Sequence, residues 1–270
     1  MNKLLTAAAL AAFATVGTAN AADLPMKAAP MGPIAAPTYG WTGFYLNAGF
    51  GYGMWTADTT TIFPTGPLAG TCILCVTQTQ GGRGWLGTVG GGFDWQFSDR
   101  IVAGAFLDTD FSRIRGTIQD QGPFFAGRIT ETWSWAAGGR IGWLVTPQIL
   151  SYFNGGFTQT HFDGAAMQDT FTGITTPFVT PAFTKSGFFI GGGMEAMFAP
   201  GWFWRSEYRY ADYGTVNLTD TAPGLGPVVV VPGVGGFGNP QATITFHPIV
   251  QTLRSEIVYK FNWGPVVAKY

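Results

Sequence analysis

The sequence has few charged residues. Asp, Glu, Lys and Arg make up 11% of its 270 residues, whereas a soluble domain carries about a quarter, so an ordinary water-facing surface is not expected. The 14 basic and 15 acidic residues nearly balance, which gives no support for a nucleic-acid-binding surface. After the N-terminal region, no apolar run approaches the roughly 18 residues that a membrane-spanning helix needs.

Glycine and aromatic residues are abundant instead, with 40 Gly, 23 Phe, 10 Trp and 9 Tyr. The aromatic content excludes a disordered chain, because such chains lack apolar mass to bury. The glycines follow no three-residue repeat, which excludes collagen. This composition predicts a β protein that faces something other than water.

The N-terminal residues predict export. Lys3 precedes an apolar stretch from Leu4 to Val16, and Ala19-Asn20-Ala21 has the small-x-small pattern of a signal-peptidase site. Residues 1–21 are therefore expected to be a Sec signal peptide that is removed before Ala22. Residues 22–40 contain four prolines, which cannot donate to a β ladder, and are expected to form an extended periplasmic linker. Residues 41–270 remain for the folded domain.

From residue 41 onward, apolar residues alternate with glycine or polar residues at a period of two, which predicts β-strands. There is no helical pattern between the alternating segments. Eight segments show the alternation: 44–54, 85–97, 101–111, 133–145, 149–157, 188–198, 202–213 and 249–261.

The charges sort onto one face of these strands. A soluble barrel would hide its aliphatic residues and expose its charges, but here the opposite face is almost wholly apolar. An apolar exterior around a charge-balanced interior suits a closed barrel in lipid. The ionisable residues predicted to face the lumen as an ion-pair network are Asp94, Asp108, Asp110, Arg140, Glu195, Arg205, Glu207, Arg209, Arg254, Glu256 and Lys260.

Connection lengths and tryptophan spacing agree with this interpretation. Short links at 98–100, 146–148 and 199–201 alternate with long ones at 56–84, 112–132, 158–187 and 214–248. We therefore predict an all-β, eight-stranded antiparallel transmembrane β-barrel with short periplasmic turns and four long extracellular loops. Ten residues of tilted strand climb about 25 Å, which is the height between the aromatic girdles of such barrels. The predicted girdles are Trp41, Trp95, Trp143, Trp202 and Trp263 at one interface, and Trp55, Trp85 and Trp133 at the other.

Several motifs carry a family resemblance. They are Ala22–Pro25, Trp41–Tyr45, Gly138–Trp143, Phe189–Glu195, Trp202–Gly214 and Tyr259–Tyr270. The chain resembles the porin-family, OmpA/OmpX-like outer-membrane barrels of alphaproteobacteria, which include outer-membrane antigens of Brucella and haemin-binding proteins of Bartonella. Phe106 stands where that family often has Glu, and Gly138 where it often has Arg, so a thinner interior network is expected. The resemblance implies the cell outer membrane as the location.

An eight-stranded barrel is just wide enough for side chains to fill. The expected function is therefore a structural and surface-interaction role with a lumen largely filled by ion pairs. The alternative is a narrow passive channel for small solutes, in which the same charges act as a selectivity ring. A haem-binding surface protein or an outer-membrane enzyme using His161 or His247 is less favoured, and no catalytic residue is assigned.

Outer-membrane lipid and lipopolysaccharide are the expected surroundings, with the barrel-assembly machinery acting during biogenesis. Loop 214–248 contains the apolar run Val228–Val231, and exposed apolar patches often mark contacts, so a surface partner is expected there. Cys72 and Cys75 are expected to form a local disulfide in the oxidising compartment. No metal site or cofactor is predicted, because a structural zinc site takes four ligands. Nothing in the sequence predicts the oligomeric state.

Overall fold

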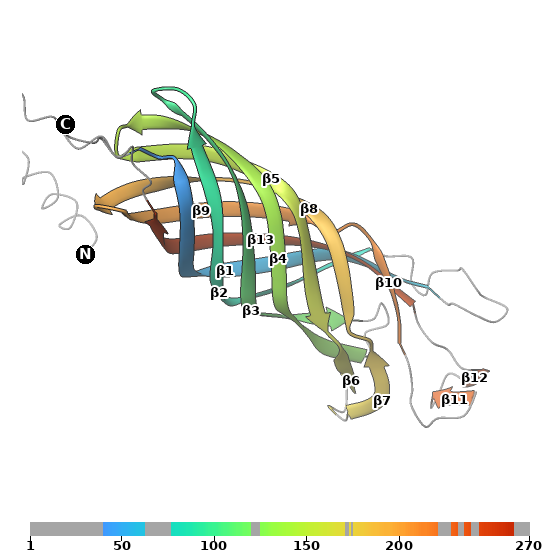
Figure 1. Ribbon diagram of the computed structural model, residues 1–270. Coiled ribbons are helices and arrows are strands. Elements are labelled where there is room, and N and C mark those ends of the chain that lie inside the picture. Colours follow the sequence, from blue (N-terminus) through green and yellow to red (C-terminus); the bar gives the residue numbers. More distant parts are fainter. Residues whose placement is uncertain are drawn as a thin grey trace, which may run out of the picture. The chain divides into compact units, whose positions relative to one another are not determined.

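The computed structural model describes residues 40–62, 77–119, 125–170, 173, 175–220, 228–231, 235–238 and 243–261. Within them, eight long antiparallel strands close into a barrel (Figure 1). The strands are β1 (Gly43–Ile62), β2 (Gln78–Gln96), β3 (Ile101–Gln119), β4 (Phe125–Thr146), β5 (Ile149–Asp163), β8 (Phe183–Ala199), β9 (Trp202–Asp212) and β13 (Thr243–Lys260). Each strand pairs with two neighbours, and β1 pairing with β13 completes the ring. The predicted eight-stranded antiparallel barrel is confirmed.

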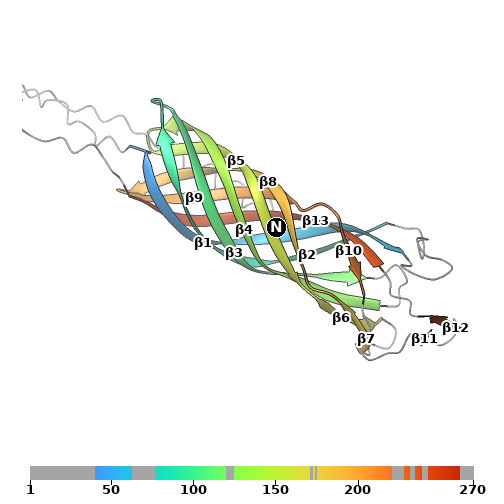
Figure 2. The same cartoon turned by 45° about the vertical axis from the view of Figure 1, so that its right-hand side comes forward.

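The two ends of the barrel differ in their connections. At one end, here called the turn end, residues 97–100, 147–148 and 200–201 link consecutive strands. At the opposite loop end, β6 (Ala165–Asp169) pairs with β4 and with β7 (Thr175–Thr180), and β10 (Val216–Thr219) pairs with β13. Figure 2 shows β6, β7 and β10 at the same end in a second view. The strands β11 (Val228–Val231) and β12 (Gly235–Gly238) pair with each other in a separate two-stranded sheet.

The outer wall of the turn-end half is apolar around all eight strands. Along β1, for example, Phe44, Leu46 and Phe50 are exposed, while the alternate residues Tyr45 and Asn47 are buried inside. An outer wall of this composition does not suit water, because soluble monomers rarely expose apolar patches of this extent. This apolar belt consists of Phe44, Leu46, Phe50, Tyr52, Met54, Trp85, Val89, Phe93, Trp95, Phe97, Leu107, Phe111, Ile141, Trp143, Val145, Phe153, Phe157, Phe188, Ile190, Met194, Phe198, Trp202, Trp204, Tyr208, Leu253, Ile257, Tyr259 and Phe261.

Toward the loop end the two faces of the wall exchange character. On β3, Arg113 and Arg115 are exposed outside, whereas Ile114 between them is fully buried in the lumen. On β4, Arg128 is exposed and the adjacent Ile129 is fully buried. Apolar-in and polar-out is the alternation of a sheet with one face in water, so these strand halves lie beyond the apolar belt.

This exchange explains why the strands are longer than expected. The segments 56–84, 112–132, 158–187 and 214–248 were predicted as loops because the apolar-out alternation ends at their borders. In the structure, β1 continues to Ile62 and β3 to Gln119, and β4 already begins at Phe125. The backbone ladder continues past the belt, and only the side on which the apolar residues lie has changed.

The loop-end half of the lumen is filled by apolar side chains. Trp55, Phe162 and Phe246, from β1, β5 and β13, are fully buried and contact one another edge to face. We call this group the apolar plug; it comprises Trp55, Ile114, Ile118, Ile129, Phe162, Met167, Leu218, Ile244 and Phe246. A second buried cluster at the turn end includes Trp41, Tyr45, Val102, Leu144, Tyr152 and Phe203.

Candidate functional site in the barrel lumen

All eleven ionisable residues predicted for the lumen point into it, and none is more than 5% exposed. They come from β2, β3, β4, β8, β9 and β13, always from the face opposite the apolar belt. The structure brings them together as two networks. The turn-end network is Asp94, Arg140, Glu195, Arg205, Glu256 and Lys260, and the central network is Asp108, Asp110, Glu207, Arg209 and Arg254.

Glu195 is the centre of the turn-end network, because three cations surround its carboxylate. Arg140 Nη1 and Arg205 Nη2 donate to Glu195 Oε2 at 3.0 and 2.9 Å, and Lys260 Nζ lies 2.8 Å from Oε1. Asp94 shares two of these cations, accepting from Arg140 Nε at 2.9 Å and from Lys260 Nζ at 2.7 Å. Three carboxylates therefore balance three cations, once Glu256 on Arg205 is included at 3.2 Å.

Aromatic rings complete the packing of these cations. The guanidinium of Arg140 lies 4.7 Å from the ring centre of Tyr45 and 5.1 Å from that of Tyr152. The ammonium of Lys260 lies 4.2 Å from the ring of Trp41. Such contacts are stronger when desolvated, so the rings both stabilise the cations and occupy space that water would otherwise fill.

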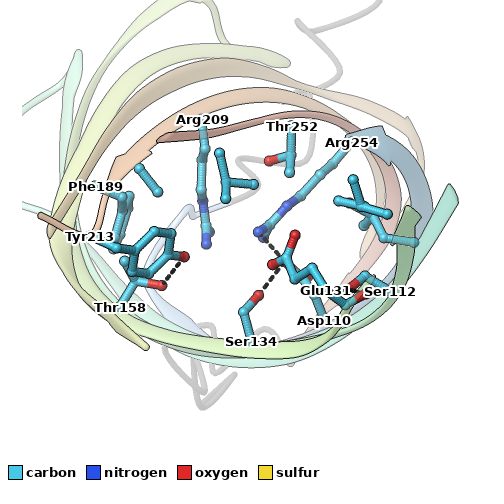
Figure 3. Close-up of a pocket in the computed structure, with 14 residues that line it drawn as sticks. Asp110, Ser112, Glu131, Ser134, Thr158, Phe189, Arg209, Tyr213, Thr252 and Arg254 are labelled. Atoms are coloured by element: carbon cyan, nitrogen blue, oxygen red, sulfur yellow. Dashed lines mark hydrogen bonds and ion pairs between the residues drawn. The ribbon is translucent and has the colours of Figure 1, made fainter. Parts of the chain in front are cut away.

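The central network crosses the lumen from β9 and β13 to β3. Arg209 Nη1 donates to Asp108 Oδ1 at 2.9 Å, and Arg254 pairs with both Asp108 and Asp110. Figure 3 shows Arg254 reaching toward Asp110 across the barrel, with Arg209 beside it. Glu207, which pairs with Arg209, also accepts hydrogen bonds from Tyr152 Oη at 2.7 Å and from the side-chain amide of Asn154.

A small cavity of about 20 Å³ lies beside the central network. Asp110, Arg254, Thr252 and Glu131 are among its lining residues (Figure 3). Within the described part of the chain, Glu131 Oε2 and Thr252 Oγ1 have no hydrogen-bond partner. A volume of about 10–15 Å³ holds one water, so the cavity has room for about a single water.

Some lumen residues were missed by the sequence patterns. Glu131 is 2% exposed and accepts from Thr160 Oγ1 at 2.8 Å, but it fell inside a predicted loop. Tyr152 and Asn154 lie on the polar face predicted for 149–157, although no role was assigned to them. Asn47 donates to Glu256 at 3.0 Å, and its place on the inward face of β1 was the available signal.

Two of the predicted girdle tryptophans are inside the barrel, so this part of the girdle prediction is wrong. Trp55 is fully buried in the apolar plug, and Trp41 is 2% exposed, donating from Nε1 to the carbonyl of Pro147 at 3.1 Å. Both have odd numbers, and the odd residues of β1 face the lumen. Spacing along the sequence was weighed above the face of the strand, which gave the wrong side.

The other described girdle tryptophans are on the outer wall. Trp85, Trp95, Trp143 and Trp202 are exposed by 44–66%, and Trp133 is half-buried beneath His161, whose ring stacks on it at 5.4 Å. Trp263, Cys72 and Cys75 lie outside the described residues, as do the signal peptide 1–21 and the linker up to residue 39.

Neither histidine is in the lumen networks. His161 Nδ1 is 2.8 Å from Thr184 Oγ1, and His247 Nε2 is 2.8 Å from Asp212 Oδ1 on the neighbouring strand. In the described ranges, no group of three or more His, Cys, Asp or Glu is arranged to hold a metal ion. No helix among the residues with described structure is long and apolar enough to cross a membrane.

Comparisons with known proteins place the chain among outer-membrane proteins. Residues 6–227 match the family model described as outer membrane protein beta-barrel domain. The 31 kDa outer-membrane immunogenic proteins of Brucella melitensis and Brucella suis are each 30% identical over 227 residues, which is 82% of this chain and 90% of the relative.

Solved structures with detectable similarity include the Neisserial surface protein A (NspA) and OprG from Pseudomonas aeruginosa. NspA is 13% identical with a TM-score of 0.40, covering 82% of this chain and 98% of its own. OprG is 12% identical with a TM-score of 0.46, covering 83% and 98%. Given the family match over most of its length, this chain belongs to the outer-membrane β-barrel proteins and resides in the cell outer membrane.

Proposed function

We propose that the barrel is closed to solutes and that its role is structural and interactive at the cell surface. The observation that carries this proposal is the double filling of the lumen. Within the belt, two networks of buried ion pairs span the lumen, and beyond the belt the apolar plug occupies it. A solute would have to break buried charge pairs and also displace Trp55, Phe162 and Phe246.

Breaking these pairs is costly. Removing one partner of a buried ion pair leaves an uncompensated charge and costs about 3–5 kcal/mol. The networks are therefore expected to stay closed on the timescale of solute passage, and their primary effect is to hold the strands of the barrel together.

Liposome swelling tests this proposal. Proteoliposomes with the refolded protein should swell in isosmotic arabinose no faster than protein-free liposomes. A variant with Trp55→Ala, Phe162→Ala and Phe246→Ala removes the centre of the plug but keeps the ion pairs, and should also stay closed. Swelling of the unmodified protein at rates that fall with sugar size would contradict the proposal.

A narrow passive channel is the second candidate. The small cavity beside Asp110 and Arg254, with unpartnered oxygens on Glu131 and Thr252, favours it, because such groups attract water into the lumen. In that case Arg254→Ala should increase swelling, since it widens the lumen at the central network, whereas a closed barrel would show no permeation in either form.

We also propose that the protein has no catalytic activity and binds no cofactor. His161 Nδ1 lies 2.8 Å from the exposed Thr184 hydroxyl and its Nε2 lies 3.5 Å from Asp163, while His247 Nε2 lies 2.8 Å from Asp212. Thr184 is therefore the one hydroxyl that a histidine base could activate among these contacts, but it is exposed on the strand surface, and neither histidine lines the lumen cavity. A phospholipid-hydrolysis assay and a haem absorbance titration, each repeated on the His161→Ala/His247→Ala variant, test this. Activity or haem binding that the double substitution abolishes would reverse it.

The proposed processing and surface contacts also follow from the outer-membrane location. We propose cleavage before Ala22, with 22–40 as a periplasmic linker and 41–270 as the barrel that the assembly machinery inserts; the intact mass of the mature protein tests the cleavage site.

The paired strands β11 and β12 support a partner-contacting role for 214–248. Protease added to intact cells should cut within this segment, and full protection of the segment would exclude its exposure at the cell surface.

A further inference from the structure

Four arginines occupy the outer wall just beyond the apolar belt. They are Arg83 on β2, Arg113 and Arg115 on β3, and Arg128 on β4, and all four are exposed. The four other strand arginines all face the lumen. The outer wall of β2–β4 is thus the place where basic side chains gather outside the barrel, and we call these four residues the arginine patch.

The strand register places the four arginines at neighbouring positions on adjacent strands. Arg83 is directly opposite Arg115, and Arg128 is opposite Thr117, two residues along β3 from Arg115. Directly opposed residues have Cβ atoms about 5 Å apart, and diagonal neighbours about 7–8 Å apart. Arg113 and Arg115 share one face because alternate residues of a strand point the same way.

Among the described residues, the outer-wall carboxylate nearest the patch by register is Asp163 on β5, diagonal to Arg128, and the ion pair found for it is with His161. None of the ion pairs found in the described structure includes any of the four arginines. The described strand carboxylates of β2, β3 and β4 all face inward. Like charges directly opposite each other destabilise a sheet, so an external anion bound between these arginines would stabilise the wall.

The height of the patch identifies where that anion lies. Arg83 is two residues beyond Trp85, and Arg113 is two residues beyond Phe111. Trp85 and Phe111 are belt residues exposed by 66% and 63%, and two residues span about 7 Å of strand. The guanidinium groups therefore lie where the hydrocarbon of the outer leaflet gives way to its headgroups.

We propose that the arginine patch binds phosphate groups on the headgroup of the outer-leaflet glycolipid. Arginine presents a planar fork that holds phosphate by paired, charge-assisted hydrogen bonds. The acyl chains of the same molecule would lie on the belt below, along Trp85, Val89 and Phe111. The other outer-wall charges beyond the belt include Asp58 on β1, Asp163 on β5 and Asp212 on β9, so the site is confined to one side of the barrel.

The site can be tested on the folded protein in detergent micelles by native mass spectrometry with purified lipopolysaccharide. Arg83→Gln/Arg115→Gln removes the directly opposed pair. Each lost hydrogen bond to a charged group weakens binding by roughly tenfold or more, so the pair variant should bind at least about tenfold more weakly. Arg100→Gln is the matched control, because Arg100 is exposed in a turn at the opposite end and should bind like the unmodified protein.

Two further arms separate the source of the phosphate. Lipopolysaccharide stripped of its phosphates should bind the unmodified protein as weakly as the intact lipid binds the pair variant. Inorganic phosphate should compete only at far higher concentration than the lipid; competition at equal concentration would overturn the glycolipid assignment. The heat-dependent gel mobility of each variant reports folding, and Arg128→Gln replaces the pair variant if the latter does not fold.

Unchanged lipopolysaccharide binding in folded Arg83→Gln/Arg115→Gln would overturn the inference. This outcome is independent of the proposed function, because the patch is on the outer wall and liposome swelling reports only on the lumen.

Discussion

The turn-end network offers a quantitative test of how charge balance stabilises the barrel. Glu195→Gln keeps the shape of the side chain but removes its negative charge. Arg140, Arg205 and Lys260 then face only Asp94 and Glu256, so one buried cation is uncompensated. The expected loss in the free energy of unfolding is about 3–5 kcal/mol, the usual cost of breaking a buried ion pair from one side.

A second substitution should restore most of this loss. Lys260→Met removes one cation while keeping an unbranched side chain beside Trp41, so Glu195→Gln/Lys260→Met again has two carboxylates against two arginines. Replacing a whole buried pair by neutral groups is often close to neutral in stability. The double variant should therefore be at least about 2 kcal/mol more stable than the sum of the single losses predicts.

Urea unfolding of the refolded barrel in phospholipid vesicles, followed by tryptophan fluorescence, measures all three variants. Asp99→Asn is the control, because Asp99 is an exposed turn residue and surface changes stay within about 0.5 kcal/mol. Losses for Glu195→Gln below about 1 kcal/mol, or strictly additive losses in the double variant, would show that charge balance in this network does not stabilise the barrel, since an additive result means that the two charges do not depend on each other.

Two further predictions concern close packing and the belt. Gly116→Ala should destabilise the barrel by about 1–3 kcal/mol, because a Cβ there would lie 2.3 Å from the ring of Trp55. Gly87→Ala is the control and should change stability little, because its Cβ would meet nothing nearer than 3.9 Å. Equal losses in the two variants would exclude this packing of Gly116 against Trp55. Phe153→Arg should cost about 2–4 kcal/mol in vesicles, because Phe153 is 77% exposed within the belt, while Thr215→Arg beyond the strands should cost little. Equal unfolding midpoints for Phe153→Arg and Thr215→Arg would mean that the belt does not face lipid.

The sequence alone was sufficient for the fold and for the side of the wall on which each charge within the apolar belt lies. Period-two alternation locates a strand whichever face is buried, and lipid forces apolar residues outward, so Arg140, Glu207 and Arg254 could be assigned to the lumen. Their partners could not be assigned. Arg140 reaches Asp94 from β4 to β2, and such a contact across the lumen depends on the diameter and stagger of the closed ring.

The loop-end half was missed because its alternation has the opposite sign. Beyond the belt, Ile114 and Ile129 face inward and the arginines outward, so a search for apolar-out strands stops at the belt. For the same reason Glu131, Phe162 and the rest of the plug were expected in loops, except Trp55, which was assigned to an outer girdle. Reading both signs of the alternation would have extended β1 and β3 and placed Trp55 in the lumen.

Conductance of single barrels in planar lipid bilayers measures whether charge pairs and an apolar plug close the lumen. We expect the unmodified protein to insert and to show at most small, flickering currents at either polarity. Steady steps on the nanosiemens scale, reproducible across insertions, would contradict it, because ions cannot pass at that rate through a lumen in which Glu195 and Arg254 keep their partners.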